Sequence, residues 1–365
     1  MTTTHPDPKG GRAAYAAPID AIVMAGTHRN ARRLINGRNK AFLDVAGRPL
    51  VRHVVDALTG ARHVDSVYVV GPEDDLRPLL ADCPRTTLVP QEGKLLSNAW
   101  AAVRAVEANH ADLGPERLAE RPILLISCDL PLVSPGAIDD FVERAAAIDR
   151  QATAGHAMLV GIAEDAALRP FYSDDKGPGM ERPLVQMREG LYRLSNIYVA
   201  RPRKLEHSEF LQTSFTLRKA KDWHNVVKLV FSLFSQHGGW FAAWMTCRLQ
   251  LTAMLRKGRG RLYRRLRAGN TFEKIERGVS TVLGGSVRLV DSPYGGLSLD
   301  IDDEVDFDLL ARRWADWMRV GEDLDRAAGR APAQTPYSSA SDSGGQKAMT
   351  STTASSPKKK GRVER

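Results

Sequence analysis

The stretch LLISCDLPLV, residues 124–133, sets one carboxylate, Asp129, at the end of an apolar run that is typical of a buried strand. A charged side chain is costly to bury unless a partner compensates its charge. Asp129 therefore lies at the exposed tip of a strand or holds a cation there. Helix capping does not require it, since Ser134 and Pro135 suit the start of the helix that follows. A solvated turn and a cation site both stay open.

Strands and helices alternate along the chain around this stretch. Helical patterns separate the predicted strands, which include residues 20–24, 64–71, 86–90 and 123–127. This alternation predicts an α/β fold, with a Rossmann-like, mostly parallel sheet that carries helices on both faces. Ligands of such sheets bind at the carboxyl ends of the strands, which is where Gly26 and Asp129 lie.

The composition is that of an ordinary globular protein, with 43% apolar residues, 26% charged residues and a net charge of +9 over 365 residues. The basic excess favours anionic partners: phosphorylated small molecules, nucleic acid or acidic lipid surfaces. Three scattered cysteines without metal-ligand spacing predict a reduced, cytoplasmic setting and no structural zinc. Residues 1–17 are expected to be a disordered leader without a secretory signal, and residues 329–365 a disordered tail.

Several pieces of sequence follow one another in a specific order. They are IDAIVMAG (19–26), NKAFLDVAGRPLV (39–51), LLISCDLPLV (124–133) and LSLDIDDEVDFDLL (297–310). This ordered set resembles the MobA-like nucleotidyltransferases, which have a GT-A-like, Rossmannoid domain. The resemblance implies a nucleotidyltransferase core over residues 18–200. It also implies a return to that core over residues 276–328, with a late acidic strand and a C-terminal helix.

The resemblance assigns the loop after the first strand to a nucleoside triphosphate and Lys40 to its phosphates. Backbone N–H groups at such a turn cradle an anion, and glycine lets the backbone approach closely. The implied nucleotide-binding residues are Ala25, Gly26, Thr27, Gln91, Gly93 and Asn98. For Asn98, backbone hydrogen bonding in a turn is an equally ordinary role.

The phosphate loop departs from the family pattern, A-G-x-G-x-R-M before P-K. This chain reads AGTHRNARRLINGRNK from residue 25 to residue 40, with His28 in place of the second glycine and Asn39 in place of the proline. Either arginines of the loop, with Arg29 and Arg32 as the catalytic candidates, grip the phosphates instead, or catalysis is weakened.

Two acids match the metal ligands of the family. Asp129 matches the metal-binding aspartate, and Asp302 aligns best with the second ligand, with Asp300 expected on the same face of the late strand. Two carboxylates suit Mg²⁺, which keeps water and substrate phosphates as its other ligands. Part of the acidic stretch 300–308 also fits a helix N-terminus stabilised by the helix dipole.

The acceptor-binding candidates are Asn196 and Arg182. Asn196 lies in a predicted strand where related enzymes present an asparagine or glycine to the acceptor, and Arg182 lies in a loop beside it. Backbone hydrogen bonding is the alternative for Asn196.

Residues 201–275 form a basic helical insertion that compact family members lack. No acid occurs from Trp223 to Phe272, and residues 256–267 are dense in arginine. The uncharged stretch before them approaches the length of a membrane span, but glycines at 238–239 interrupt it and favour two helices. Three interpretations are open: packing on protein, an amphipathic hairpin on anionic lipid, and nucleic-acid binding, which no motif supports.

These features predict a Mg²⁺-dependent transfer of a nucleoside monophosphate from an NTP, with CTP favoured, to a phosphorylated small molecule or lipid precursor. Pyrophosphate is the second product. Two alternatives are a GT-A glycosyltransferase, which releases a nucleoside diphosphate and does not need Lys40, and a non-catalytic nucleotide-binding protein recruited to anionic membranes. The expected location is the cytoplasm, including the inner face of the membrane.

Overall fold

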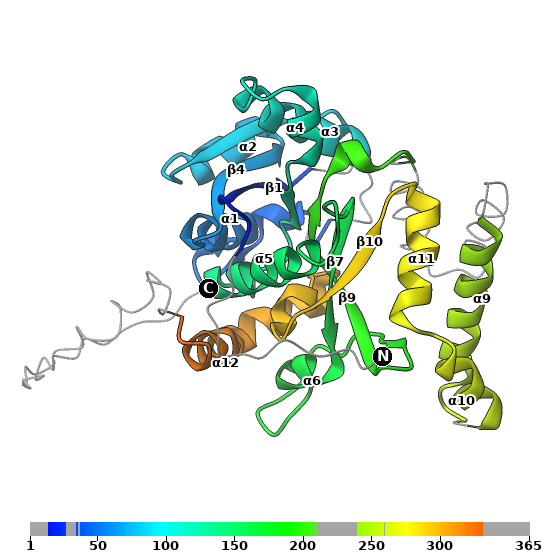
Figure 1. Cartoon of the computed structure of the whole chain (residues 1–365). Coiled ribbons are helices and arrows are strands. Elements are labelled where there is room, and N and C mark those ends of the chain that lie inside the picture. Colours follow the sequence, from blue (N-terminus) through cyan, green and yellow to red (C-terminus); the bar gives the residue numbers. More distant parts are fainter. Residues whose placement is uncertain are drawn as a thin grey trace, which may run out of the picture. The chain divides into compact units, whose positions relative to one another are not determined.

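The computed structural model describes residues 14–26, 34–35, 37–207, 209, 239–258 and 260–330. An eight-stranded sheet forms their centre (Figure 1). Its strands are β1 (Ile19–Met24), β4 (Val64–Gly71), β5 (Thr86–Pro90), β6 (Ile123–Ser127), β7 (Met158–Glu164), β8 (Val185–Gln186), β9 (Leu191–Ala200) and β10 (Val287–Asp291). A separate two-stranded ribbon pairs β2 (Asp44–Val45) with β3 (Arg48–Pro49).

The strand order is β10-β7-β9-β6-β1-β4-β5, with β8 paired to β9. β1 runs parallel to both β4 and β6, β5 runs parallel to β4, and β10 runs parallel to β7. β9 is antiparallel to β6 and β7. The carboxyl ends of β1, β5, β6 and β7 therefore meet at one edge of the sheet, which confirms the mostly parallel arrangement.

Helices cover both faces of the sheet, as predicted. They are α1 (Leu50–Gly60), α2 (Glu73–Leu80), α3 (Leu95–Asn109), α4 (Pro115–Glu120), α5 (Pro135–Asp149), α6 (Asp165–Leu168), α9 (Gly239–Leu255), α10 (Arg261–Ala268), α11 (Phe272–Leu283) and α12 (Glu304–Ala327). Successive side chains of a strand point to opposite faces. Val23 of β1 accordingly packs with α1 and α5, whereas its neighbour Ile22 packs with α3.

Short 3-10 turns complete the fold: η2 (Lys40–Phe42), η3 (Arg169–Phe171), η4 (Pro202–Lys204) and η5 (Gly295–Ser298). The long helix α12 packs Leu310 and Trp317 in a buried cluster with Leu43, Leu50 and Ile301. This cluster brings the segment after η5 against the segment that contains η2, although about 260 residues separate them in sequence. The core packing thus places residue 302 beside residue 40.

The expected acidic strand near residues 300–302 is wrong. These residues follow η5 without joining the sheet, and the last strand, β10, ends earlier, at Asp291. The residues that follow are held by other contacts, since the Ile301 N–H donates to the Asp129 carbonyl at 3.2 Å. The C-terminal helix was predicted correctly.

The insertion packs on the sheet through α9 and α11. Ala243 of α9 and Val282 of α11 share a buried cluster with Val287 of β10, and α11 lies between β10 and α9 in Figure 1. Helix α11 continues to Leu283, beyond the expected boundary at residue 275. Residues 223–238, the first half of the predicted helix pair, lie outside the described part. Among the described helices, none combines the length and the apolar character that crossing a membrane requires.

The described core extends slightly into both expected terminal segments. The Tyr15 hydroxyl donates to Asp149 Oδ2 at 2.6 Å. At the other end, the Arg330 guanidinium lies 2.9 Å from Glu143 Oε2. Residues 14–17 and 329–330 therefore belong with the folded domain, and the rest of the expected leader and tail lies outside the described residues.

Candidate active site

Gly26 lies at the carboxyl end of β1, in close contact with the turn after β5. A Cβ atom at position 26 would lie 2.6 Å from Asn98 Nδ2 and 3.5 Å from Gln91 Oε1. Only a residue without a side chain fits this distance. The structure thus brings together three of the predicted nucleotide-binding residues: Gly26, Gln91 and Asn98.

Asn98 shapes the turn beside Gly26. Its side chain is buried near the start of α3, and Oδ1 accepts hydrogen bonds from the backbone N–H groups of Glu92, at 2.6 Å, and Gly93, at 3.1 Å. Gly93 has a φ of +97°, a conformation that favours glycine. The turn-forming role considered for Asn98 is therefore observed, while a direct nucleotide contact stays a prediction.

Asn39 fixes the start of η2 and hence Lys40. Its Oδ1 accepts from the Ala41 N–H at 3.2 Å, and its Nδ2 donates to the Ala25 carbonyl at 3.4 Å. One side chain thus caps the turn and ties it to the end of β1. In the sequence, Asn39 stands where the family has a proline, and the hydrogen bonds of its side chain were not predicted. Asparagine is a preferred N-cap residue, so its position directly before η2 was the signal that could have found this role.

Lys40, Asp129 and Asp302 converge at this edge of the sheet. The Lys40 ammonium Nζ lies 3.5 Å from Asp129 Oδ2 and 3.3 Å from Asp302 Oδ1. The side chains of Lys40 and Asp129 are 14% and 13% exposed, whereas that of Asp302 is 48% exposed. The predicted meeting of these three residues is therefore observed. The Ser127 hydroxyl, which the sequence did not single out, also donates to Asp129 Oδ1.

The charge of Lys40 is set by two opposing effects. Burial alone lowers the pKa of an ammonium, but attraction to Asp129 and Asp302, with the hydrogen bond to Asp302, outweighs burial and raises the pKa of Lys40 above its ordinary value. Lys40 is therefore cationic at neutral pH. It is held between two carboxylates that would otherwise repel each other.

Asp300 has a different partner from Asp302, and the strand on which the two acids were expected to share a face is absent. Asp300 is buried and pairs with Arg193 of β9, whose Nη2 lies 2.8 Å from Oδ1. Burial raises the pKa of Asp300, but Arg193 and Arg182 lower it by more, so the net pKa is below the usual value. Asp300 thus anchors the late segment through its ion pair with Arg193.

The acids after Asp302 start α12, as the helix N-terminus interpretation predicted for part of this stretch. Asp303 is the N-cap and accepts from the Asp306 N–H at 3.0 Å. Asp306 Oδ2 in turn accepts from the Asp302 N–H at 2.9 Å and from Arg182 Nη2 at 2.6 Å. Arg182 therefore holds the segment that carries Asp302, and its contact with an acceptor stays a prediction.

Asn196 lies in β9 beside the strand that leads to Asp129. Ile197 pairs with Ile126 in the antiparallel register, so Asn196 is one step beyond the last registered pair of β6 and β9. This position is on the same edge as the converging charges and is compatible with the predicted acceptor contact. Thr27, Arg29 and Arg32 lie outside the described residues, so their roles stay predictions.

The donor set near Lys40 fits a hard divalent cation. Two carboxylates already surround one positive charge there, and carboxylate oxygens are the ligands that Mg²⁺ prefers. In the described part of the chain, no group of three or more His, Cys, Asp and Glu side chains is arranged to hold a metal. Two protein ligands are enough for Mg²⁺ when substrate phosphates and water complete the shell.

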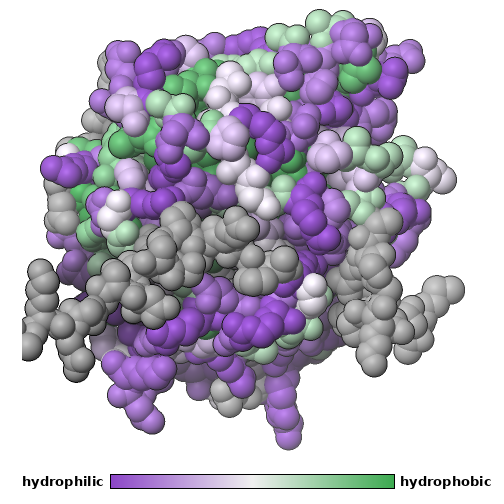
Figure 2. Space-filling view, turned by 90° about the vertical axis from the view of Figure 1, so that its left-hand side faces the viewer, coloured by the Kyte–Doolittle hydropathy of each residue, from purple (hydrophilic) through white to green (hydrophobic). Residues whose placement is uncertain are grey.

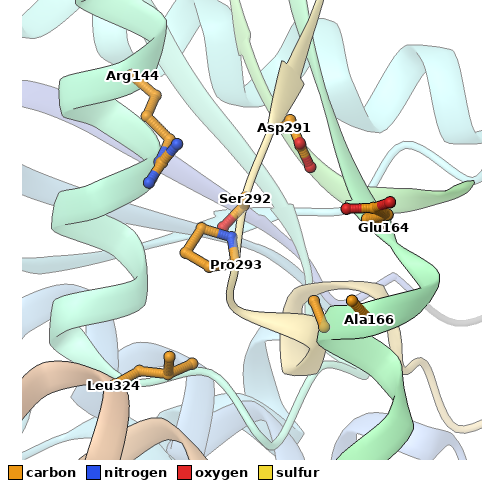
Figure 3. Close-up of a pocket in the computed structure, with 8 residues that line it drawn as sticks. Arg144, Glu164, Ala166, Asp291, Ser292, Pro293 and Leu324 are labelled. Atoms are coloured by element: carbon orange, nitrogen blue, oxygen red, sulfur yellow. The ribbon is translucent and has the colours of Figure 1, made fainter. Parts of the chain in front are cut away.

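A separate pocket of about 340 Å³ lies at the carboxyl ends of β7 and β10. Figure 3 shows Arg144 of α5 on one side of it, with Glu164 and Asp291 from the two strand ends on the other. None of the predicted site residues lines this pocket. A second pocket, of about 400 Å³, lies beside His156 and Lys204 and is equally separate from them.

Comparison with known families gives one domain match. Residues 21–184 match the model described as the MobA-like NTP transferase domain. The match covers the segment with β1, the Lys40 turn, the 91–98 turn and Asp129, and it ends before β9.

Several curated enzymes align with parts of the chain, and two of them are described here. The 2-C-methyl-D-erythritol 4-phosphate cytidylyltransferase of Chlorobium luteolum is 28% identical over 131 residues, which are 33% of this chain and 52% of that enzyme. The chain thus spans about half the length of this relative. The 3-deoxy-manno-octulosonate cytidylyltransferase of Anaeromyxobacter dehalogenans is 25% identical over 204 residues, which are 50% of this chain and 80% of that enzyme.

One solved structure, a hypothetical transferase from Thermus thermophilus, shares the fold. Its TM-score is 0.53 at 20% sequence identity, and the alignment covers 79% of this chain and 99% of that one. At this identity the likeness establishes the common architecture.

Proposed function

We propose that this chain transfers a nucleoside monophosphate from a nucleoside triphosphate to a phosphorylated small molecule or lipid precursor, since residues 21–184 match the MobA-like NTP transferase domain. A phosphate oxygen of the acceptor attacks the α-phosphorus, and the bond from that phosphorus to the bridging oxygen breaks, so that pyrophosphate leaves. The main structural support for this proposal is that the Lys40 ammonium lies between Asp129 and Asp302 at the carboxyl edge of the sheet. CTP is the favoured donor, since the two relatives described above are cytidylyltransferases by name.

In this proposal the chain positions the reactants and compensates charge, because phosphoryl transfer leaves the protein little covalent chemistry. Asp129 and Asp302 are the residues that would hold Mg²⁺, whose chemistry here is the neutralisation of phosphate charge. Lys40 stays protonated and supplies a compact positive charge to the phosphates that become pyrophosphate. The two carboxylates and the Asn39 cap keep its side chain at the sheet edge.

The nucleotide is proposed to lie over the turn after β1. Gly26 lets the backbone after β1 approach the side chains of Asn98 and Gln91, so that the turn after β1 and the 91–98 turn lie against each other. The turn built on Asn98 presents Gln91 and Gly93 next to it. On the other side of Asp129, Asn196 and Arg182 are the proposed acceptor residues, with Arg182 also fixing the position of Asp302 through Asp306.

The test is pyrophosphate release by the full chain with each of the four NTPs in the presence of Mg²⁺. Acceptors are supplied as soluble and lipid fractions of a cell extract, since both acceptor classes are proposed. Release of pyrophosphate that needs an acceptor fraction and is fastest with CTP supports the proposal. Release of a nucleoside diphosphate from a nucleotide sugar indicates a glycosyltransferase instead. NTP binding without turnover across all fractions indicates a non-catalytic nucleotide-binding protein.

A matched pair of variants connects that activity with the site. Asp129→Asn removes a carboxylate next to Lys40, whereas Asp308→Asn removes an exposed carboxylate from the first turns of α12. The first variant is expected to lose activity and the second to keep it. Equal activity in both variants contradicts the assignment of Asp129.

A further inference from the structure

Helix α9 carries an apolar stripe on the side that faces away from the sheet. The stripe consists of Trp240, Trp244, Cys247, Leu251 and Met254, which are spaced alternately by four and three residues and therefore share one side of the helix. Trp240 is 64% exposed and Met254 is 70% exposed. Exposure of this size at large apolar side chains, repeated along one line, marks an interaction surface.

Packing among the described residues does not account for this stripe. Ala242, Ala243 and Met245 of α9 are buried, and the two alanines pack against α11 and β10. Helix α9 is therefore apolar on its inner side, where it joins the core, and apolar again on its outer side.

A cluster of cations continues from the end of the stripe. Its members are exposed and lie between α9 and the end of the second turn of α10: Arg256, Lys257, Arg261, Arg264 and Arg265. Within the described ranges, none of them forms an ion pair with an acid. The sequence explains why local partners are lacking, since no Asp or Glu occurs from residue 223 to residue 272.

The stripe and the cation cluster are held together as one surface. Arg248 of α9 donates from Nε to the Leu266 carbonyl of α10 at 3.1 Å, and its guanidinium carbon lies 5.2 Å from the centroid of the Trp244 ring. Leu262, which is 56% exposed, adds a further apolar side chain on α10. We call α9 and α10 with these exposed residues the basic arm.

We propose that the basic arm is a docking surface for a lipid bilayer that contains anionic lipids. Tryptophan prefers the boundary between the lipid headgroups and the acyl chains, and an exposed apolar face with adjacent arginines is the pattern of a helix that lies in that boundary. The unpaired cations complement the negative surface potential of anionic lipid. This inference does not depend on the proposed transferase activity.

Two other occupants fit the surface less well. In a symmetric dimer the same patch meets itself, and this patch offers no acid to the cations, since no Asp or Glu occurs from residue 223 to residue 272. Nucleic acid would neutralise the cations but would leave the exposed Trp240 and Met254 without an apolar partner. A bilayer satisfies both parts of the arm at once.

Figure 2 shows the face on the other side of the molecule, turned away from α9, where hydrophilic side chains surround the apolar ones.

Exposed arginines on α12 provide the matched control: Arg319 and Arg326 are 65% and 75% exposed but each pairs with an acid. Their removal changes the net charge as much as removal of two cations of the arm does.

The experiment is co-sedimentation of the full chain with vesicles at about 0.1 M salt, where charges near a surface still attract. The chain is expected to bind vesicles of phosphatidylcholine mixed equally with phosphatidylglycerol and not vesicles of phosphatidylcholine alone. The double variant Arg261→Gln/Arg265→Gln is expected to bind about 30-fold more weakly, since each cation near an anionic surface contributes about fivefold. Trp240→Ala/Met254→Ala is expected to lose at least about tenfold, and Arg319→Gln/Arg326→Gln to bind as the unaltered chain does.

Several results would overturn the proposal. One is a folded chain that does not bind the anionic vesicles, and another is binding that the α12 control weakens as much as the arm variants do. Light scattering that shows a dimer which Trp240→Ala/Met254→Ala makes monomeric would assign the stripe to a second copy. Tighter binding to nucleic acid than to vesicles, lost in Arg261→Gln/Arg265→Gln, would assign the cations to nucleic acid. Circular dichroism of each variant establishes that it is folded.

Discussion

The sheet edge and the basic arm use positive charge in opposite ways. At the sheet edge one lysine, Lys40, is mostly buried and has two carboxylates within 3.5 Å. On the arm, a cluster of cations is exposed and has no acidic partner among the described residues. A buried and paired charge has a fixed position, which chemistry on a triphosphate requires, whereas exposed and unpaired charges attract a partner without fixing a geometry.

The largest expected effect is a loss of turnover when the buried cation, Lys40, is removed, in contrast to removal of an exposed cation of the arm. Lys40→Ala is expected to reduce turnover at least ~100-fold, because a preorganised charge at the reacting phosphates is lost. Arg261→Ala removes a cation from the arm and is expected to leave turnover unchanged with a soluble acceptor. Steady-state pyrophosphate release measures both variants, and circular dichroism establishes that each one folds. A similar loss of turnover in Lys40→Ala and Arg261→Ala would contradict the separate roles proposed for the sheet edge and the basic arm.

A second comparison uses glycine in the two regions. Gly26→Ala places a methyl group 2.6 Å from Asn98 Nδ2, so the 91–98 turn must shift. We expect a loss of about 1–3 kcal/mol in stability and a higher KM for the NTP. At Gly258, just after α9, a Cβ meets no described atom within 4 Å except the Leu255 carbonyl oxygen, at 3.8 Å, so Gly258→Ala is the control. Thermal unfolding and KM measurements check both, and an unchanged KM in Gly26→Ala would contradict the proposed nucleotide position.

The third prediction concerns pH. The folded-state pKa of Asp300 lies below its ordinary value of 3.8, so the charged carboxylate contributes stability that is present above pH 3.8 and is lost as the pH falls through the folded-state pKa. Asp300→Asn is expected to cost about 1–3 kcal/mol at pH 7 and progressively less below pH 3.8. Denaturant unfolding at a series of pH values measures this difference.

The arm supplies the control for this pH dependence. Arg265 has no acidic partner among the described residues, so Arg265→Gln is expected to change stability little and equally at every pH in the series. A cost of Asp300→Asn that stays constant from pH 7 down to the acid limit would contradict a stabilising pair with Arg193.

The sequence predicted the parts of the fold that depend on local patterns. Alternating strands and helices gave the sheet, and its carboxyl edge placed Gly26 and Asp129 correctly, because strand direction follows from chain order in a mostly parallel sheet. The ordered motifs also predicted that residue 302 reaches residue 40. These inferences needed no knowledge of side-chain partners.

The errors concern residues whose structure depends on distant partners. The family resemblance implied an acidic strand near residues 300–302, but Arg193 from β9 and Arg182 hold this segment outside the sheet. For Asn98 the sequence left turn formation and nucleotide contact open, and only the structure shows that its Oδ1 accepts from two backbone N–H groups of its own turn. The outer stripe of α9 was equally hidden, since a helix that is apolar on two sides gives no clear amphipathic pattern.

The smallest expected effect tests how the sheet edge holds Lys40. Asn39→Ala removes the η2 cap and the hydrogen bond to the Ala25 carbonyl, at an expected cost of about 1 kcal/mol. Asn39→Pro restores the family's residue at a φ of −63°, which suits proline, so a gain of about 0.4–1 kcal/mol from the restricted unfolded chain offsets most of the lost cap. Unfolding free energies are thus expected to rank the unaltered chain and Asn39→Pro close together and Asn39→Ala below both. If Asn39→Pro is instead the least stable, the Asn39 side chain positions Lys40 in a way that the family's proline does not reproduce.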